Sequence, residues 1–366
     1  MVRPGVQFNG WLILAVLVPL AGYTQSALRG KVTDGKSGEP VPFANVFFSH
    51  TTMGSPTLEN GTFEIKNIPN GKYDLTVSVV GYKRFHESME FEGTDLELLI
   101  VLEQDPGNLS EVIIYADHSD YKKYLPVFRK YFLGESINSV QCAIANPTDI
   151  FLYYDAKTDV LTGHASKPIV VANVRLGYRI HYILDLFEVN FKTGVKTLRG
   201  IPRFEELPLE RERTQKQWDK RRNVAYHGSL THFMRALYNG SVEKEGFRVT
   251  RVDSVDLAHY GGNGVKEYPI NVGEHISGTT VKSFRFKGIL KVVYREEAEE
   301  YGYRRSFSLR PGNFQESLLK FTTDRINIFE NGYYLDQLSV FLDGYLSWSE
   351  TIGELLPRSY YPSIEK

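Results

Sequence analysis

Alternating apolar and polar positions recur along the N-terminal part of the chain. Between residues 28 and 102 the alternating or apolar runs are LRGKVTD, VPFANVFFS, GTFEIKNI, KYDLTVSVVGY and LELLIVL. They are separated by DGKSGEP, ENG and PNG, in which Gly permits a positive φ and Pro removes a backbone donor. Regular turn spacing with a period of two predicts an antiparallel β-sandwich over residues 27–104.

Longer apolar runs in residues 119–366 predict a larger β-rich domain with a few helices. The strand candidates are DIFLYYD, PIVVANV, YRIHYILDLFEVNF and ILKVVYRE, and RINIFENGYYLDQL contains the Asn-Gly signal of a hairpin. One face of the third candidate consists of Tyr178, Ile180, Tyr182, Leu184 and Leu186. Polar side chains alternate with these positions, which indicates one covered and one wetter face.

Two helices are predicted within this region. The charged stretch ERERTQKQW has Glu212 and Lys216 at helical spacing, and we interpret it as a helix with a solvated face. Ser229 is placed to cap a second helix that Gly240 would close. Its apolar face comprises Leu230, Phe233, Met234 and Leu237, and His232 is expected on the exposed side.

The composition narrows the class of protein. With 366 residues and 42% hydrophobic content, the chain is long enough for about two domains with substantial cores. The 43 Lys and Arg residues against 44 Asp and Glu residues give a net charge of -1. Nucleic acid is therefore not expected as a partner, because its recognition normally needs a basic excess.

The N-terminus is typical of a secretory signal peptide over residues 1–26. Arg3 precedes the apolar run WLILAVLVPLA at residues 11–21, which is shorter than the ~18 residues needed to span a bilayer. We expect export to the periplasm or the outer membrane and no transmembrane span in the mature chain.

Cys142 is the one cysteine, which excludes a lipid-modified N-terminal cysteine and an internal disulfide. We interpret Cys142 as a buried small residue.

The N-terminal sequence resembles the carboxypeptidase-regulatory-like domain through GKVTDGKSGEPVPFANVFF and NGTFEIKNIPNGKYDLTVSVVGYKR. The resemblance implies a transthyretin-like β-sandwich of a kind abundant in exported proteins of Bacteroidetes-type bacteria. The turn at residues 57–61 lacks the Asp that is frequent in the family. The family module also precedes TonB-dependent receptor barrels, but the residues after a linker at 105–118 are too few for such a barrel. They resemble the uncharacterised C-terminal region of stand-alone exported proteins, which implies no activity.

Residues 30–37 formally match the phosphate-binding loop pattern, with Gly30, four residues, and Gly-Lys-Ser. Such a loop needs a helix directly after it, whose N-terminal amides face the phosphates. Pro40 and Pro42 occupy that place. We therefore expect a polar turn that binds no nucleotide.

The sequence AYHGSLTHF brings His227, Ser229 and His232 close together. The two histidines are five residues apart without a neighbouring Glu, so the zinc-peptidase pattern fails, and the glycines of a nucleophile elbow are missing. The carboxypeptidase zinc motif, His followed by Glu three positions later, does not occur at any histidine, and the pair His86 and Glu87 does not replace it. We favour the structural helix over a catalytic site.

The acidic clusters do not indicate a catalytic site any more clearly than the histidines do. Asp253 and Asp256 stand near each other, and the larger cluster consists of Glu296, Glu297, Glu299 and Glu300. Adjacency does not show that a fold brings carboxyl groups to both sides of a cleft, so solvated charge is the simpler interpretation. The Gly-rich loop at residues 258–265 is expected to hold no cofactor.

We therefore expect a non-enzymatic, exported, envelope-associated protein that binds or scaffolds an envelope protein or a glycan. No catalytic, cofactor-binding or metal-binding residue is assigned. The alternative hypothesis is a peptide or glycan hydrolase with its site in the C-terminal domain. A pocket with convergent carboxyl groups or histidines of shifted pKa would favour that alternative.

Overall fold

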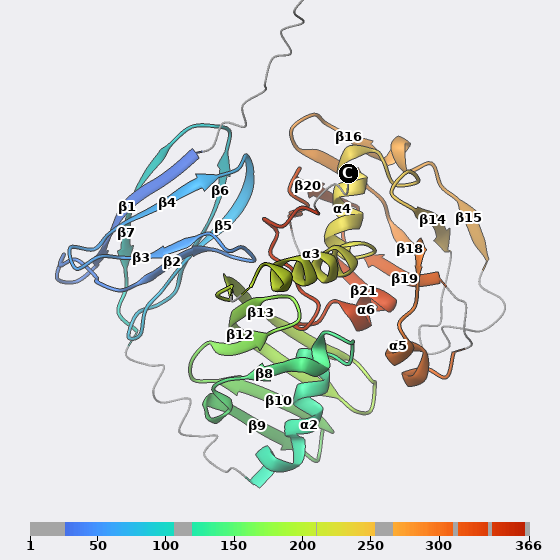
Figure 1. Cartoon of the computed structure of the whole chain (residues 1–366), viewed down its shortest axis with the longest axis horizontal. Coiled ribbons are helices and arrows are strands. Elements are labelled where there is room, and N and C mark those ends of the chain that lie inside the picture. The colour runs from blue at the N-terminus through green and yellow to red at the C-terminus, as the bar shows by residue number, and fades with distance from the viewer. Residues whose placement is uncertain are drawn as a thin grey trace, which may run out of the picture.

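The computed structural model describes residues 26–105, 119–209, 211–252, 266–309, 314–335 and 339–362. The predicted linker beyond residue 105 and all but the last residue of the predicted signal peptide lie outside these ranges. Of the helices in the described ranges, none combines the length and the apolar character required to cross a bilayer. Figure 1 shows an N-terminal sandwich beside a larger C-terminal region, and strands dominate both. The mainly β fold class is confirmed.

The N-terminal sandwich consists of two sheets around one core. Its strands are β1 Ser26–Asp34, β2 Asn45–Phe48, β3 Gly54–Pro56, β4 Thr62–Ile68, β5 Gly71–Ser78, β6 Phe85–Phe91 and β7 Leu96–Leu102. The strand orders are β4-β1-β7 and β3-β2-β5-β6. Alternate inward positions such as Leu28, Phe48 and Leu75 are fully buried. The sandwich is confirmed, but its pairing is not antiparallel throughout, because β7 runs parallel to β1. A strand that arrives from the opposite sheet is not bound to the direction that a hairpin turn imposes.

The segment that matches the phosphate-binding pattern is a strand followed by a turn. Gly30 lies within β1, where a Cβ atom would come within 2.2 Å of a backbone carbonyl oxygen of β7. Asp34 ends the strand, and its Oδ1 accepts hydrogen bonds from the amides of Lys36 (2.8 Å) and Ser37 (2.7 Å). The next element is β2, not a helix. The turn is confirmed, and a carboxylate already occupies two of the amides that a phosphate would use.

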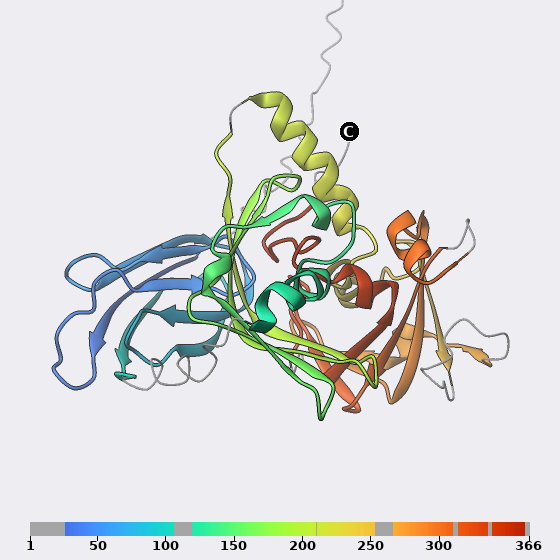
Figure 2. The same cartoon turned by 90° about the horizontal axis from the view of Figure 1, so that it is seen from below.

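The first part of the C-terminal region is a six-stranded sheet covered by a helix. Its elements are α2 Ser119–Leu133, η1 Ser139–Gln141, β8 Cys142–Ile144, η2 Pro147–Asp149, β9 Ile150–Asp155, β10 Val160–Ala165, β11 Ile169–Asn173, β12 Tyr178–Asn190 and β13 Lys196–Glu206. The order is β8-β11-β12-β10-β9, and β13 also pairs with β12. Figure 2 shows α2 against this sheet. The Phe128 ring lies 4.7 Å from that of Phe187, and Phe132 lies 5.3 Å from Tyr182.

Strand β12 follows the predicted alternation only as far as a bulge. The buried positions before it are as predicted, namely Tyr178, Ile180 and Tyr182. The pairing with β13 then shifts between Leu184 and Leu186. Beyond the shift Phe187 and Val189 are buried, and the expectation for Leu186 is wrong. An extra residue in one strand turns the following side chains to the other face, and alternation alone does not locate it.

The second part of the C-terminal region has two sheets and several helices. Its elements are α3 Glu212–Tyr226, α4 Leu230–Asn239, β14 Phe247–Val252, β15 Glu267–Pro269, η4 Val272–His275, β16 Ile276–Ser277, β17 Lys282–Arg285, β18 Gly288–Ala298, α5 Tyr301–Ser306, β19 Phe314–Phe321, β20 Arg325–Ile328, β21 Val340–Gly344 and α6 Tyr345–Ser349. The strand orders are β15-β14-β18-β19-β21 and β16-β17-β20. The apolar face of α4 enters a second core between these sheets, through Phe233, Met234 and Leu237.

Helix α3 confirms the predicted charged helix, but it is not solvated on every side. Trp218, Arg222 and Tyr226 are buried. The Arg222 guanidinium lies 4.0 Å from the centre of the Tyr178 ring and donates to the Leu176 carbonyl at 2.7 Å. A buried arginine that is paired in this way looks like a surface charge in the sequence, which explains why the covered face was missed.

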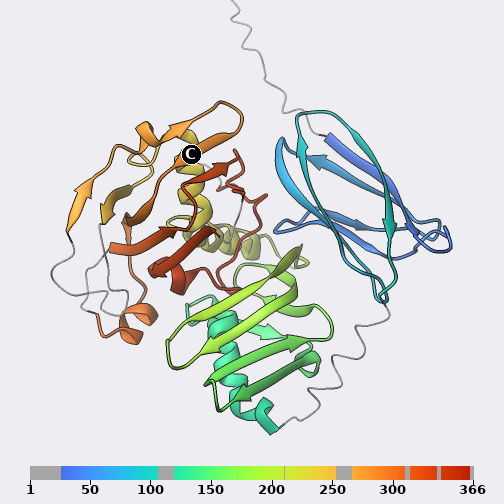
Figure 3. The same ribbon diagram turned by 180° about the vertical axis from the view of Figure 1, so that it is seen from behind.

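The sandwich contacts the C-terminal region directly, as Figures 1 and 3 show. The predicted Asn-Gly hairpin forms after β20, and Asn331 at its tip donates to the Lys72 carbonyl of β5 at 2.9 Å. The His50 amide donates to the Pro202 carbonyl, and the Arg358 amide donates to the His50 carbonyl, both at 2.7 Å. The sandwich is therefore anchored by the chain segment that also closes the pocket described below.

Candidate functional site

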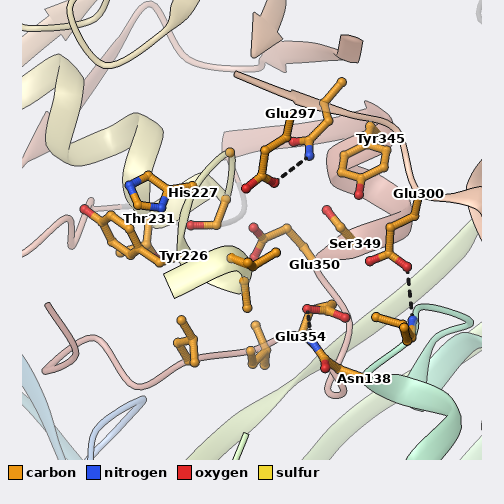
Figure 4. A pocket seen from close by; sticks show the side chains of 18 of the residues that line it. Asn138, Tyr226, His227, Thr231, Glu297, Glu300, Tyr345, Ser349, Glu350 and Glu354 are labelled. Atoms are coloured by element: carbon orange, nitrogen blue, oxygen red, sulfur yellow. Dashed lines mark hydrogen bonds between the residues drawn. The ribbon is translucent and has the colours of Figure 1, made fainter. Parts of the chain in front are cut away.

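A pocket of about 340 Å³ lies between the two cores of the C-terminal region and is drawn in Figure 4. Its walls come from residues 137–138, residues 224–231 between α3 and α4, the end of β18 with one residue of β19, and residues 345–360. Four glutamates line it, namely Glu297, Glu300, Glu350 and Glu354. No Lys or Arg is among the described residues that line the pocket, and His227 is the single imidazole there.

The wall between α3 and α4 is held by the ends of these helices. Gly228 has a φ of 77°, and a Cβ atom there would lie 2.3 Å from Oε1 of Gln315, so the turn requires glycine. The Ser229 hydroxyl accepts a hydrogen bond from the His232 amide at 3.2 Å and caps α4. Gly240 ends α4 in the left-handed conformation, with a φ of 65°. The start, the stop and the apolar face predicted for this helix are confirmed.

His232 is buried, with 2% of its surface exposed, and the expectation of an exposed position is wrong. Its Nδ1 accepts a hydrogen bond from the Gly228 amide at 3.1 Å, so Nε2 carries the proton and donates to Glu245 at 3.2 Å. Burial lowers the pKa of His232 to about 4, so it is neutral at pH 7. His232 thus holds the turn that borders the pocket. Removal of the His232 ring would leave the buried Gly228 amide without an acceptor, which would destabilise the fold. Helical periodicity does not indicate this contact.

Two pocket carboxyl groups come from the end of β18 and from the residues between β18 and α5. Glu297 accepts a hydrogen bond from the Gln315 side chain at 3.2 Å, and Glu300 accepts one from a backbone amide of the loop after α2 at 3.0 Å. Glu299 is 4% exposed, and Glu296 is exposed. The interpretation of this run as solvated charge is therefore wrong for three of its four acids. The strand ends between β19 and the loop after α2, so neighbours in sequence enter different surroundings.

The other two carboxyl groups follow α6. Glu350 accepts a hydrogen bond from the Leu230 amide at the start of α4, at 2.7 Å. Glu354 accepts hydrogen bonds from the Ser136 hydroxyl and, at 2.9 Å, from the Asn138 side chain. Neither glutamate belongs to a cluster of acids in the sequence. Their only signal is a spacing of four residues, which is equally common in solvated helices.

Burial raises the pKa of all four carboxyl groups. Glu297 and Glu354 reach about 7, with desolvation as the largest cause and the Glu300 charge as a further one. The pKa values of Glu300 and Glu350 are also raised, again chiefly by desolvation. Near neutral pH the pocket therefore holds carboxyl groups that exchange protons easily and whose charge is poorly hydrated.

Tyrosines and one histidine complete the polar lining. Tyr226 and Tyr345 are buried, and Figure 4 shows the Tyr345 hydroxyl directed toward the carboxyl side chains. The Tyr360 hydroxyl oxygen is buried without a hydrogen-bond partner among the described residues. His227 Nδ1 lies 2.8 Å from the Asn223 carbonyl oxygen and must donate to it, which leaves Nε2 as an acceptor. The pocket is rich in hydrogen-bond acceptors.

The remaining sequence candidates lie elsewhere. The His-Glu pair of β6 is exposed, and the buried position predicted for Cys142 is confirmed. Burial raises the pKa of the Cys142 thiol to about 12, so little thiolate forms. Asp253, Asp256 and the loop at residues 258–265 fall outside the described residues. Within the described ranges, no three His, Cys, Asp or Glu side chains are grouped so that they could hold a metal ion.

Comparison with protein families identifies the N-terminal module. Residues 28–114 match the CarboxypepD_reg-like domain, which confirms the resemblance found in the sequence. The match covers the sandwich and does not include the pocket. No curated protein matches the chain.

Similar solved structures share only limited parts of the fold. The catechol 1,2-dioxygenase of an Acinetobacter species has 13% identity and a TM-score of 0.19, over 24% of this chain and 54% of the other. The minor pilin of Streptococcus agalactiae has 12% identity and a TM-score of 0.20, over 23% and 46%. A candidate carbohydrate binding protein of Bacteroides uniformis has 10% identity and a TM-score of 0.19, over 49% and 78%. The chain spans about half the length of the first two, and these similarities support no functional assignment.

Proposed function

We propose that this chain is an exported, envelope-associated protein that binds or scaffolds an envelope protein or glycan without catalysing a reaction. The C-terminal region recognises the partner through its acidic pocket, and the sandwich is a docked accessory module. One observation carries this proposal, the pocket whose four carboxyl groups are oriented by hydrogen bonds from three separate segments, namely the loop after α2, the start of α4 and β19. The accessory-domain match over residues 28–114 supports a binding role.

Export rests on the predicted signal peptide, and one contact of β1 supports processing before Ala27. The Ala27 amide donates to Asp95 Oδ1 at 2.8 Å. Cleavage at this point would leave an amino group beside a carboxylate, which would form a charge-assisted hydrogen bond. N-terminal sequencing of protein from the native host is expected to begin near Ala27. A mature chain that retains Met1 would rule out this route.

Capture from envelope extract tests the role of the pocket. The bait is the mature chain, and Glu297→Gln removes one pocket charge while it preserves the shape of the side chain. Glu296→Gln is the matched control, because Glu296 is an exposed neighbour on the same strand. We expect captured material, identified by mass spectrometry, to fall at least about fivefold with Glu297→Gln and to stay unchanged with Glu296→Gln. Equal capture by both variants would show that the pocket does not bind the captured partner.

A peptide or glycan hydrolase is the second candidate, and the near-neutral carboxyl groups favour it. Glu297 and Glu354 have pKa values of about 7, which suits proton transfer at neutral pH. We place it second because Ser229 is engaged as a helix cap and His227 Nδ1 is engaged by a carbonyl, so no serine nucleophile is paired with a histidine base there. Turnover of peptide or glycan libraries that Glu297→Gln abolishes, with the fold intact, would reverse this order.

A further inference from the structure

The charge of the pocket restricts the groups that it can hold. Four carboxyl groups line it, and its described lining contains no Lys or Arg. Arg175 and Arg358 lie nearby, since each of them lowers the pKa of one of these glutamates. Neither arginine lines the pocket. An anionic group would meet like charge in a poorly hydrated space, whereas a cation would offset the desolvation of the carboxylates.

The hydrogen-bonding groups of the pocket point to the same class of ligand. Carboxylate oxygens and the His227 Nε2 atom are acceptors, and the donors from Gln315 and Asn138 are already bonded to Glu297 and Glu354. A ligand group must therefore bring several donors of its own. An ammonium group has three donors and no acceptor, which complements such a lining.

The tyrosines supply an observation that is independent of the acids. The buried Tyr360 hydroxyl has no partner among the described residues although it belongs to a residue that lines the pocket. The ring centres of Tyr226 and Tyr360 are 6.1 Å apart at an interplanar angle of 62°, so two aromatic surfaces meet at this side of the pocket. Aromatic rings attract cations through their negative faces, so these two rings favour a cationic group at this side of the pocket.

We infer that the group bound by this pocket is a protonated primary amine, held among Glu297, Glu300, Glu350 and Glu354 and bordered by Tyr226 and Tyr360. This inference rests on the proposed binding function and names the chemistry of its ligand. The volume of about 340 Å³ is at the low end for ligand pockets and suits one side chain or one sugar unit. A lysine side chain of an envelope protein and an amino sugar of an envelope glycan share the required ammonium group.

Binding of a cation must be coupled to the protons of the pocket. The groups that face the ligand are the four glutamates and His227, with the Arg175 and Arg358 charges behind them. Protonation of the glutamates as the pH falls makes the pocket less negative. A lysine ammonium keeps its charge over the same range. Affinity is therefore expected to rise between pH 6 and pH 8, and binding below pH 8 to release protons.

Calorimetry with small probes tests this inference on the mature full chain. The probes are Nα-acetyl-lysine methylamide and glucosamine, and their neutral counterparts carry an Nε-acetyl or an N-acetyl group. We expect one of the amines to bind, its neutral counterpart to bind at least about tenfold more weakly, and Glu297→Gln to weaken the amine about tenfold. Glu296→Gln is expected to leave binding unchanged. The amine that binds identifies a protein or a glycan as the source of the group.

The outcomes separate this inference from the proposed function. Equal binding of amine and acetylated probes, or amine binding that Glu297→Gln does not change while circular dichroism shows an intact fold, would overturn the ammonium inference. Failure of both amines to bind would also overturn the ammonium inference. If capture from envelope extract still depended on Glu297, the proposed binding function would stand without that inference. Amine binding that rises with pH and depends on Glu297 would support both.

Discussion

The sandwich and the C-terminal region are both mainly β, but they differ in how far apart in the chain their contacting residues lie. The sandwich has one core and short turns between its strands. In the C-terminal region the last described segment returns to the first core, where Ile352 packs and its amide bonds to the Phe132 carbonyl at 3.2 Å. The pocket lies where the two cores share this segment. The sandwich is thus assembled within residues 26–102, whereas this pocket depends on contacts between segments that lie much farther apart in the chain.

A buried arginine holds one of the segments that form the junction between the two regions. Arg235 of α4 donates to the carbonyls of Arg358 (2.8 Å), Tyr360 (2.9 Å) and Asn331 (3.3 Å). The Arg358 amide in turn bonds to the sandwich, and Tyr360 lines the pocket. This stretch of backbone therefore contacts both the sandwich and the candidate site.

The largest expected effect is the loss of stability caused by a cavity in the second core. Phe233 is fully buried, so Phe233→Ala is expected to lower the free energy of unfolding by about 3 to 5 kcal/mol. Phe341→Ala, at a position 59% exposed, is the control and should change it by less than about 0.5 kcal/mol. Urea unfolding followed by tryptophan fluorescence isolates this region, because the predicted mature chain has only Trp218 and Trp348. An unchanged midpoint for Phe233→Ala would contradict the assignment of this core.

Arg235→Met tests the junction. The substitution leaves three backbone carbonyls without their donor, and we expect a loss of about 2 to 4 kcal/mol. Hydrogen exchange should also accelerate at the His50 and Arg358 amides, which bond across the junction. The exposed Arg248→Met serves as the control. Unchanged exchange at both amides would show that the sandwich docks independently of Arg235.

The pH dependence of stability tests the pocket acids. The Glu354 pKa is about 7 in the folded chain against 4.5 as the ordinary value, so the folded state binds more protons between these values. Stability is then greatest below pH 4.5 and falls as the pH rises through 7, by on the order of 3 kcal/mol for this group. Urea unfolding at pH 5 and pH 8 measures this difference. Glu354→Gln should reduce it, whereas Glu296→Gln should not, and an equal dependence in all three proteins would show that Glu354 ionises normally.

The smallest effect is expected at the turn after β1. Titration of the chain with ATP and magnesium should produce no binding heat, because the Asp34 carboxylate occupies the amides of Lys36 and Ser37. Lys36→Ala should accordingly leave both the titration and the unfolding midpoint unchanged. Micromolar nucleotide binding that Lys36→Ala abolishes would restore the phosphate-loop interpretation.

The candidate site was predictable only in part. The capped helix beside it could be predicted, because the Ser229 cap, the apolar face and the Gly240 stop act within one stretch of chain. Glu297 and Glu300 belong to an acidic run for which the sequence predicts solvated charge, and no local pattern marks Glu350 or Glu354. Charge in a sequence carries no record of burial, which depends on what packs against it.

By itself the sequence determined the sandwich, four strands of the larger region (β9, β11, β12 and β18) and the start and end of α4, because turn residues, alternation and caps act between near neighbours. The tertiary structure alone decided that His232 is buried, that a bulge shifts β12, and that four glutamates converge. Periodicity reports which side chains share a face, but not which distant segment covers that face. The pocket and its shifted pKa values arise from such coverage, since desolvation depends on every segment that excludes water from a carboxyl group.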